Sequence, residues 1–240
     1  MILISNPDKP QWAEILKRPM MNTENLFDTV RSVIERVKAA GDQAVLEYEK
    51  KFDGVSLPSL PVLEEEIEEA DGLIGEDLKA AIYLAKQNIE TFHAAQRFES
   101  KQVQTQPGVT CWQKAVAIEK VGLYIPGGTA PLFSTVLMLA VPAKIAGCKE
   151  IVLCTPPGKD GKVHPAVLFA AKVAGVNRIF KIGGIQAIAA MTYGTESVPK
   201  VYKIFGPGNQ YVTAAKQLVG LRDVAIDMPA GPSEVEVLAD

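Results

Sequence analysis

Residues 121–148 read VGLYIPGGTAPLFSTVLMLAVPAKIAGC, and this stretch decides the fold class. Its first residues are a short apolar run that predicts a buried strand. The PGG that follows predicts a turn, and residues 132–146 predict an apolar helix. Many nucleotide-binding sites begin with a strand, a glycine turn and a helix in this order. The stretch is therefore a candidate dinucleotide site.

The same order of elements repeats as far as residue 228. Short apolar runs alternate with helical patterns, which is typical of parallel strands joined by right-handed helical crossovers. We expect strands over residues 121–125, 150–154, 178–182, 201–205 and 224–228, and helices over residues 131–146, 165–174, 186–193 and 209–219. The second half of the chain is therefore predicted to be a doubly wound α/β domain with a parallel sheet covered on both faces.

The first half of the chain has a mainly helical pattern. Apolar residues at helical spacing predict two helices within residues 23–52, separated by a break at Gly41, and one long helix over residues 76–97. Alternating apolar and polar residues around Val109 predict a short hairpin. A boundary between the two halves is expected near residue 119.

Composition and charge restrict the class of protein. The chain has 240 residues, of which 48% are apolar and 22% charged, as in ordinary globular proteins. Its formal net charge of −3 gives no electrostatic reason to expect nucleic acid or an anionic membrane as a partner. Asn6, Asp8 and two prolines interrupt the apolar stretch that a signal peptide would need. Pro142 interrupts the most apolar segment, which is too short to span a membrane. We expect a cytoplasmic protein.

The cysteines, histidines and clustered glutamates favour no metal site or catalytic thiol. The cysteines form no CxxC pair, so buried thiols are expected rather than a disulfide framework or a zinc site. The glutamates of residues 62–74 alternate with apolar residues and are expected to face water. This interpretation covers the three cysteines, Cys111, Cys148 and Cys154, and the two histidines, His93 and His164.

Three predicted strand-to-helix turns carry glycine pairs. These are Gly127 and Gly128, Gly183 and Gly184, and Gly206 and Gly208. In an open parallel sheet such turns share the carboxyl edge, where ligands bind at a topological switch point. None of them matches the G-x-G-x-x-G fingerprint, and the second strand lacks the acidic residue that binds ribose. The glycines could admit a phosphate or could simply close tight turns.

Four polar side chains accompany these turns and the last loop. Tyr124 could pack against a base or ribose, and Gln186 and Asn209 could supply uncharged donors and acceptors. Asn209 could equally cap its own helix. Ser233 lies in a Gly-Pro turn, where a hydroxyl could contact substrate or stabilise the turn.

Four segments, at residues 121–128, 130–148, 183–209 and 225–235, resemble histidinol dehydrogenase in their order and spacing. The resemblance begins after Thr23 and continues to Asp240, and its motifs are long and specific. It implies an enzyme of histidine biosynthesis that oxidises L-histidinol to L-histidine through a bound aldehyde. It also implies that the enzyme uses two NAD in succession and one zinc ion, and that it works as a homodimer.

The resemblance also assigns residues and domains. Tyr124, Gln186 and Asn209 match positions that contact NAD, and Ser233 matches one that contacts substrate. The zinc ligands and the catalytic acid and base are implied to lie beyond Asp240, with none in this chain. The implied division is an extension (1–22), a mainly helical first part of domain one (23–119), a Rossmann-like domain that contacts NAD (120–233), and the start of a return into a truncated α/β domain one (234–240).

One residue departs from the family pattern, and other interpretations of the chain remain open. Glu236 stands where the family has an apolar residue. The first hypothesis is a partial histidinol dehydrogenase that is inactive alone, which would leave an apolar edge or face of domain one uncovered. The second is a non-catalytic module that binds a nucleotide or pairs with another polypeptide. The third is a structural protein in which Tyr124, Gln186 and Asn209 do not converge.

Overall fold

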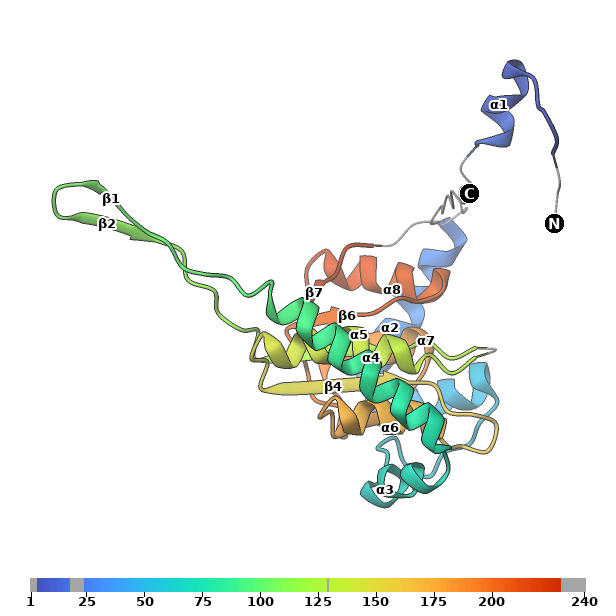
Figure 1. The fold of residues 1–240 in the computed structure, drawn as a ribbon. Coiled ribbons are helices and arrows are strands. Elements are labelled where there is room, and N and C mark those ends of the chain that lie inside the picture. The colour runs from blue at the N-terminus through green and yellow to red at the C-terminus, as the bar shows by residue number, and fades with distance from the viewer. Residues whose placement is uncertain (1–3, 18–23, 129, 230–240) are drawn as a thin grey trace.

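A five-stranded parallel sheet forms the centre of the molecule (Figure 1). The structure is a computed structural model that describes residues 4–17, 24–128 and 130–229. The strand order is β5-β4-β3-β6-β7, so the chain starts in the middle of the sheet, builds one side and then crosses to the other. The strands are β3 (Lys120–Tyr124), β4 (Glu150–Thr155), β5 (Arg178–Lys181), β6 (Lys203–Phe205) and β7 (Ala225–Ile226). The prediction of a doubly wound α/β fold is confirmed.

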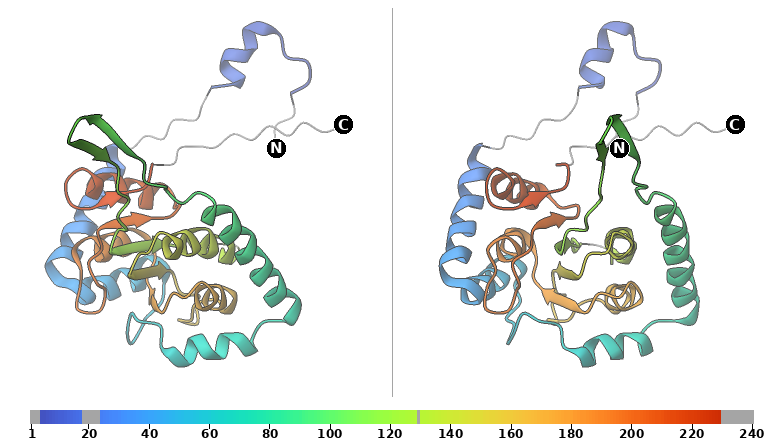
Figure 2. Two further views of the ribbon diagram at one scale, coloured as in Figure 1. Left: turned by 60° about the vertical axis from the view of Figure 1, so that its left-hand side comes forward. Right: turned by 90° about the vertical axis from the view of Figure 1, so that its left-hand side faces the viewer.

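The helices form a layer on each face of this sheet (Figure 2). One face is covered by α7 (Gly184–Tyr193) and α8 (Gln210–Gly220), and α2 (Glu24–Tyr48) packs on the outside of these two helices. The other face is covered by α5 (Phe133–Ile145) and α6 (Pro165–Val173), with α4 (Glu76–Ala94) packed on α5 and α3 (Glu64–Gly72) packed on α6. The remaining elements are α1 (Lys9–Ile15), the π-helix η1 (Glu49–Asp53), and the hairpin strands β1 (Gln102–Gln106) and β2 (Val109–Trp112).

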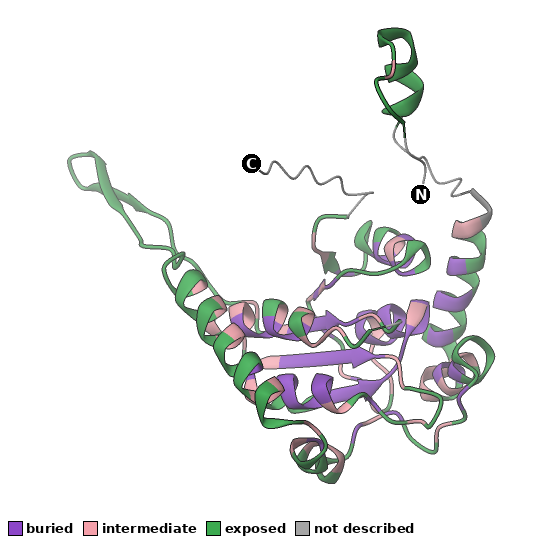
Figure 3. Cartoon of the chain, turned by 45° about the vertical axis from the view of Figure 1, so that its right-hand side comes forward, coloured by how far each residue is buried: buried purple, intermediate pink, exposed green. Residues whose placement is uncertain are grey.

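The sequence of β3 explains why the sheet is buried on both faces. Its side chains alternate between the two cores: Val121 and Leu123 pack on the α5 side, and Tyr124 packs on the α7 side. Between them, Gly122 leaves room for α7, because a Cβ at this position would lie 2.7 Å from the sulfur of Met191. A strand that is apolar on both faces is typical of a parallel sheet, and Figure 3 shows these strands as buried.

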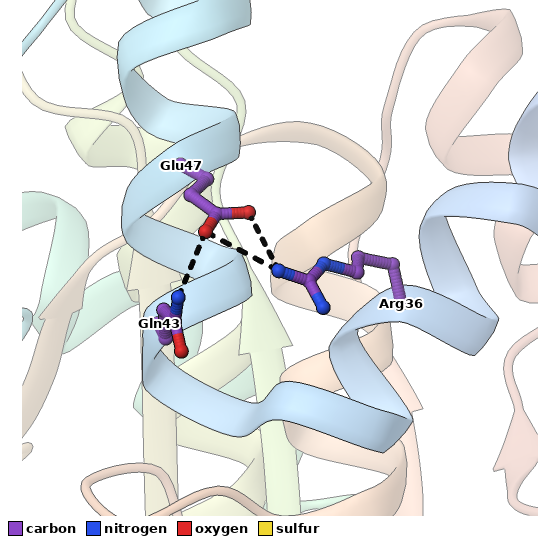
Figure 4. Close-up of polar contacts among 3 residues, drawn as sticks. All are labelled: Arg36, Gln43 and Glu47. Atoms are coloured by element: carbon purple, nitrogen blue, oxygen red, sulfur yellow. Dashed lines mark hydrogen bonds and ion pairs between the residues drawn. The ribbon is translucent and has the colours of Figure 1, made fainter.

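The break that the sequence predicts at Gly41 is confirmed, because the span of α2 consists of two helical halves that meet at a kink with a non-helical backbone at Gly41. Gly41 has a φ of 52°, a conformation that residues with a Cβ rarely adopt. Across the kink, Glu47 accepts a hydrogen bond of 3.1 Å from Arg36, and on its own side of the kink it accepts one of 3.1 Å from Gln43 (Figure 4). The kink lets the second half of α2 direct its last turn toward the carboxyl end of the sheet.

The β1–β2 hairpin extends away from the body of the molecule (Figures 1 and 2). The hairpin prediction is confirmed, but every residue of the two strands is exposed (Figure 3). The expectation that all three cysteines are buried is therefore wrong for Cys111, because β2 does not pack against the body. Cys154 is buried in β4, and Cys148 is half-buried.

Some predictions lie outside the described residues or remain untested. Ser233, Glu236 and the expected return strand from residue 234 fall outside the part of the chain that the structure describes. The division into domains stays a prediction. Helices from the first half, α2 and α4, pack directly on helices of the second half.

Candidate functional site

A cleft of about 1130 Å³ lies at the carboxyl edge of the sheet. The loops that follow β3, β4 and β5 line it, together with the start of α8, the end of η1 and one side of α3. This edge is where a doubly wound sheet binds ligands, because the loops after neighbouring strands diverge at the change in strand order. The cleft therefore has the position and size of a ligand site.

Tyr124 and the loop after β5 form part of the cleft wall. The Tyr124 hydroxyl accepts a hydrogen bond of 3.0 Å from the backbone N–H of Gly184. Gly184 has a φ of 56°, so this turn requires a residue without a Cβ. Tyr124 thus fixes the turn that begins α7. Burial raises the pKa of Tyr124 to about 12, so the hydroxyl stays protonated at neutral pH.

Gln186, on the first turn of α7, is completely buried at the bottom of this wall. Its amide nitrogen donates to Glu49 Oε1 at 2.8 Å and to Asp53 Oδ2 at 3.4 Å. Its Oε1 is buried and has no hydrogen-bond partner among the described residues. Gln186 therefore carries one acceptor oxygen, within the cleft wall, that the described residues leave unsatisfied.

Glu49 is a second completely buried polar residue, at the start of η1. Its Oε1 also accepts a hydrogen bond of 2.9 Å from the backbone N–H of Gly183. Burial raises the pKa of Glu49 from its ordinary value of 4.5 to about 7, against the opposing effect of the hydrogen bonds from Gln186 and Gly183. Burial likewise raises the pKa of Asp53.

Glu66, in α3, also lines the cleft but has a different environment. Its carboxylate lies 2.7 Å from Nζ of Lys181, at the end of β5. Burial opposes ionisation of Glu66, but the hydrogen bond and charge of Lys181 outweigh it and lower the pKa. The cleft is thus lined by an ionised carboxylate, that of Glu66, which is paired with a lysine, whereas Glu49 lies behind the wall and receives its two hydrogen bonds from neutral amides. The other glutamates of α3 are exposed, as the sequence predicts, and Glu66 is the exception.

Asn209 has the helix-capping role that the sequence left open. Its Oδ1 accepts hydrogen bonds from the backbone N–H groups of Tyr211 at 3.0 Å and Val212 at 3.1 Å, which begins α8. Asn209 and Tyr211 also line the cleft. Capping therefore leaves Asn209 in position to face a ligand.

Buried Lys216 holds the loop between β6 and α8. Its Nζ donates to the carbonyl oxygen of Gly206 at 2.7 Å and forms an ion pair with Asp227. Asp227 in turn accepts a hydrogen bond of 2.8 Å from the N–H of Gly206. Both polar groups of Gly206 are thereby fixed beside Tyr124.

Most of the glycines in the three turns are explained by close packing within the protein. A Cβ at Gly127 or Gly183 would collide with Pro156, and one at Gly206 would collide with the backbone of Tyr124. At Gly128, in contrast, a Cβ would meet only open space within 4 Å. Of these, Gly128 is the position where a ligand could approach the backbone.

The histidines and cysteines provide no metal centre. His164 caps α6 by accepting a hydrogen bond of 3.1 Å from the N–H of Ala166, and His93 packs edge-on against Phe92. Within residues 4–17, 24–128 and 130–229, no three His, Cys, Asp or Glu side chains are grouped to hold a metal ion. In the same residues, no helix is both long and apolar enough to cross a membrane.

Comparison with known proteins decides the family. The histidinol dehydrogenase family model matches residues 16–240. The chain belongs to the histidinol dehydrogenase family. Histidinol dehydrogenase from Bacteroides fragilis (strain ATCC 25285) is 78% identical over the whole chain, which covers 56% of that relative. The Escherichia coli K12 enzyme of the same name is 53% identical over 96% of the chain and is itself covered to 53%.

A solved structure agrees with this assignment to the histidinol dehydrogenase family. The crystal structure of histidinol dehydrogenase from Elizabethkingia anophelis matches with a TM-score of 0.90 at 51% identity, over 95% of this chain and 53% of that one. The chain thus spans about half the length of the histidinol dehydrogenases that it matches.

The structure brings three of the four residues predicted for the site onto one cleft. Tyr124, Gln186 and Asn209 all line it, and Ser233 lies outside the described residues. Glu49 and Asp53 were missed by sequence reasoning. Glu49 lies four residues after buried Val45, so it continues the apolar stripe of α2 into η1. A carboxyl group at such a position was the available sign of a buried acid.

Proposed function

We propose that this chain provides the NAD-binding part of a histidinol dehydrogenase. The proposed reaction is the NAD-dependent oxidation of L-histidinol to L-histidine through the aldehyde histidinal, in histidine biosynthesis. The observation that carries the proposal is the convergence of Tyr124, Gln186 and Asn209 on one cleft at the carboxyl edge of the sheet. Convergence also argues against a purely structural protein.

The residues of the cleft fit a dinucleotide. The unpartnered Oε1 of Gln186 can accept a hydrogen bond from a ribose hydroxyl or a carboxamide N–H, and Gly128 leaves room for a phosphate beside the backbone. Bound NAD would accept a hydride from the substrate carbon. The chain's own residues bind and orient the cofactor, with Tyr124 holding the turn at Gly184 in place.

The described residues do not fit the zinc ion that the family resemblance implies. They group no three potential ligands, so we assign zinc to none of them, and the family resemblance implies that the catalytic acid and base lie outside them as well. We propose that this chain alone binds NAD without oxidising histidinol. A non-catalytic nucleotide-binding or partner-pairing module is the alternative.

The proposed partner is a second copy of the chain, in line with a homodimeric family. The supporting observation is the isolated hairpin, whose Val103, Val109 and Trp112 are exposed. A two-stranded hairpin has marginal stability in water unless something packs against it. A partner surface would provide that packing.

Calorimetric titration of the chain with NAD tests the proposal. We expect saturable binding that is weakened by Gln186→Ala and by Ala130→Trp, which places a bulky ring at an exposed position in the cleft. Gln217→Ala, at an exposed position of α8 that does not line the cleft, is the matched control and should bind as the wild type does. Absence of heat at millimolar NAD, with the fold intact by circular dichroism, would contradict the proposal.

A further inference from the structure

Glu49 is buried without the groups that normally accompany a buried carboxylate. Its exposed fraction is 0%, and its two hydrogen bonds come from the neutral amides of Gly183 and Gln186. Both bonds go to Oε1. The other oxygen, Oε2, is buried and lacks a hydrogen-bond partner among the described residues. An ionised carboxylate in this position would carry an uncompensated charge, which is costly to bury.

The neighbouring charge is a second carboxyl group rather than a cation. Asp53 lies at the other end of the short helix η1, and its Oδ2 accepts at 3.4 Å from the same Gln186 amide nitrogen that donates to Glu49 Oε1 at 2.8 Å. Two ionised carboxylates that share one neutral donor repel each other, whereas one proton held by the pair removes that repulsion.

The pair controls the shape of the cleft wall through the two amides that it binds. Glu49 fixes the N–H of Gly183, and Tyr124 fixes the N–H of Gly184, so the turn is held at both of its peptide groups. Both carboxyl groups bind the amide nitrogen of Gln186, which leaves its Oε1 unpartnered. The two carboxyl groups, which lie behind the cleft wall, therefore determine the orientation of the Gln186 side-chain amide.

We propose that Glu49 is a positioning residue, which shares one proton with Asp53 and in that form holds the 183–184 turn and the Gln186 amide ready for NAD. The inference rests on the proposed function, because it names the ligand of the cleft. Glu49 does not contact NAD and acts through Gly183 and Gln186. The shared proton makes the site sensitive to pH.

The titratable groups that face Glu49 are Asp53 from η1, Tyr124 from β3 and Cys154 from β4. Burial raises the pKa of Tyr124 and of Cys154, so both stay neutral when Glu49 titrates. Glu49, with a pKa of about 7, is therefore the group whose ionisation changes the wall near neutral pH. Its loss of the proton places two negative charges behind Gln186.

The first test measures the dissociation constant of NAD at about pH 6 and about pH 8.5. For the wild type we expect affinity to fall at least about tenfold across this range, because a site that needs the protonated form weakens up to tenfold per pH unit above its pKa. Glu49→Gln keeps an acceptor for both amides and a donor toward Asp53, and its affinity should change by less than about twofold. Glu47→Gln, on the exposed side of the same segment, should behave as the wild type does.

A second measurement does not depend on NAD. Infrared spectra of the wild type at about pH 6 should contain a protonated-carboxyl band that titrates away near pH 7 and is missing in Glu49→Gln. The Gly183 amide should exchange slowly with solvent in the wild type and Glu49→Gln, and quickly in Glu49→Ala.

The outcomes separate the inference from the proposed function. A wild type that binds no NAD at any pH contradicts the proposed function and the NAD-positioning part of the inference. The infrared and exchange results then decide whether the proton-sharing pair holds the turn. Equal pH dependence in the wild type and Glu49→Gln, or no protonated-carboxyl band at about pH 6, would overturn the inference.

Discussion

At Glu49, burial links folding to protonation in the opposite direction from an ordinary salt-bridged glutamate. Its pKa rises from 4.5 to about 7 on folding, so the native state binds more protons than the unfolded state between these values. Stability is therefore full below pH 4.5 and falls as pH rises to about 7, by about 3 kcal/mol for the whole shift. The raised pKa of Asp53 acts in the same direction.

We predict that Glu49→Gln is less sensitive to pH than the wild type. Between about pH 5 and about pH 8, the free energy of unfolding measured with urea should fall by roughly 3 kcal/mol more in the wild type than in the variant. The reason is that the amide of the variant cannot ionise. Glu47→Gln serves as the control and should follow the wild type. Parallel pH profiles for all three chains would show that Glu49 is not protonated in the folded state.

Gly206 is the turn glycine with the strictest requirement. Its φ is 132°, and a Cβ would collide with backbone atoms of Tyr124, which cannot move without disturbing β3. We expect Gly206→Ala to destabilise the chain by roughly 3 kcal/mol, seen as a lower midpoint of thermal unfolding. Gly72→Ala, where nothing lies within 4 Å, should be neutral or slightly stabilising. Equal midpoints for the two variants would contradict this reasoning.

Sequence reasoning at the residue scale found the groups that lie at the ends of strands and missed those that reach the site from elsewhere. Tyr124 and Gln186 adjoin glycine turns, and turn chemistry is local. Glu49 lies in a segment far away in the sequence, and only the packing of α2 against α7 brings it under Gln186. A single sequence does not contain that contact.

At the scale of elements, α8 is fastened to the loop before it by buried Lys216. Removing the ammonium with Lys216→Met leaves the half-buried carboxylate of Asp227 and the carbonyl of Gly206 without their donor. We expect a loss of about 2 kcal/mol in denaturant unfolding, less than for a fully buried pair because Asp227 keeps access to water. Gln217→Met, next to it on the exposed side of α8, should change stability by less than about 0.5 kcal/mol. If Lys216→Met lost as little stability as Gln217→Met, the ion pair between Lys216 and Asp227 would not contribute to the stability of the fold.

Periodicity predicted the positions of the helices and strands well because most of them have strong patterns. The break in α2 shows what periodicity leaves out. Gly41 and Asp42 mark the break between two helical halves, as predicted, but the contacts that hold the break are not local in sequence: Asp42 binds Ser197 at 2.5 Å, and Glu196 accepts from the Asp42 N–H at 2.8 Å. These contacts fasten the break to the loop after α7. The π-helix η1 had no sequence pattern of its own.

At the scale of the whole molecule, the two sheet faces are covered, and the edge strand β5 is covered too. Segment 60–62 runs beside β5, where the N–H of Lys181 donates to Leu60 at 2.8 Å and that of Val62 to Ile179 at 2.9 Å. Exposed apolar side chains occur at several places on the surface, among them Leu84 and Phe92 of α4 and Trp112 of the hairpin. Those on the hairpin fit a chain that has a partner packed against it.

The hairpin allows the proposed self-association to be tested with a matched pair of variants. Val103 pairs with Cys111 across the strands and Gln104 pairs with Thr110, so these two pairs lie on opposite faces of the hairpin, and Trp112, which pairs with Gln102, lies on the face of Gln104. If a second copy packs on the face of Val103 and Cys111, Val103→Glu buries a charge in that contact, and Gln104→Glu does not. Sedimentation velocity should show the wild type and Gln104→Glu as dimers, with Val103→Glu weakened at least about tenfold in dimer affinity. Because an isolated hairpin is fully solvated in the monomer, neither substitution should change the thermal unfolding of the body. A monomeric wild type, or equal weakening by both substitutions, would mean that the face of Val103 and Cys111 does not form the contact between copies.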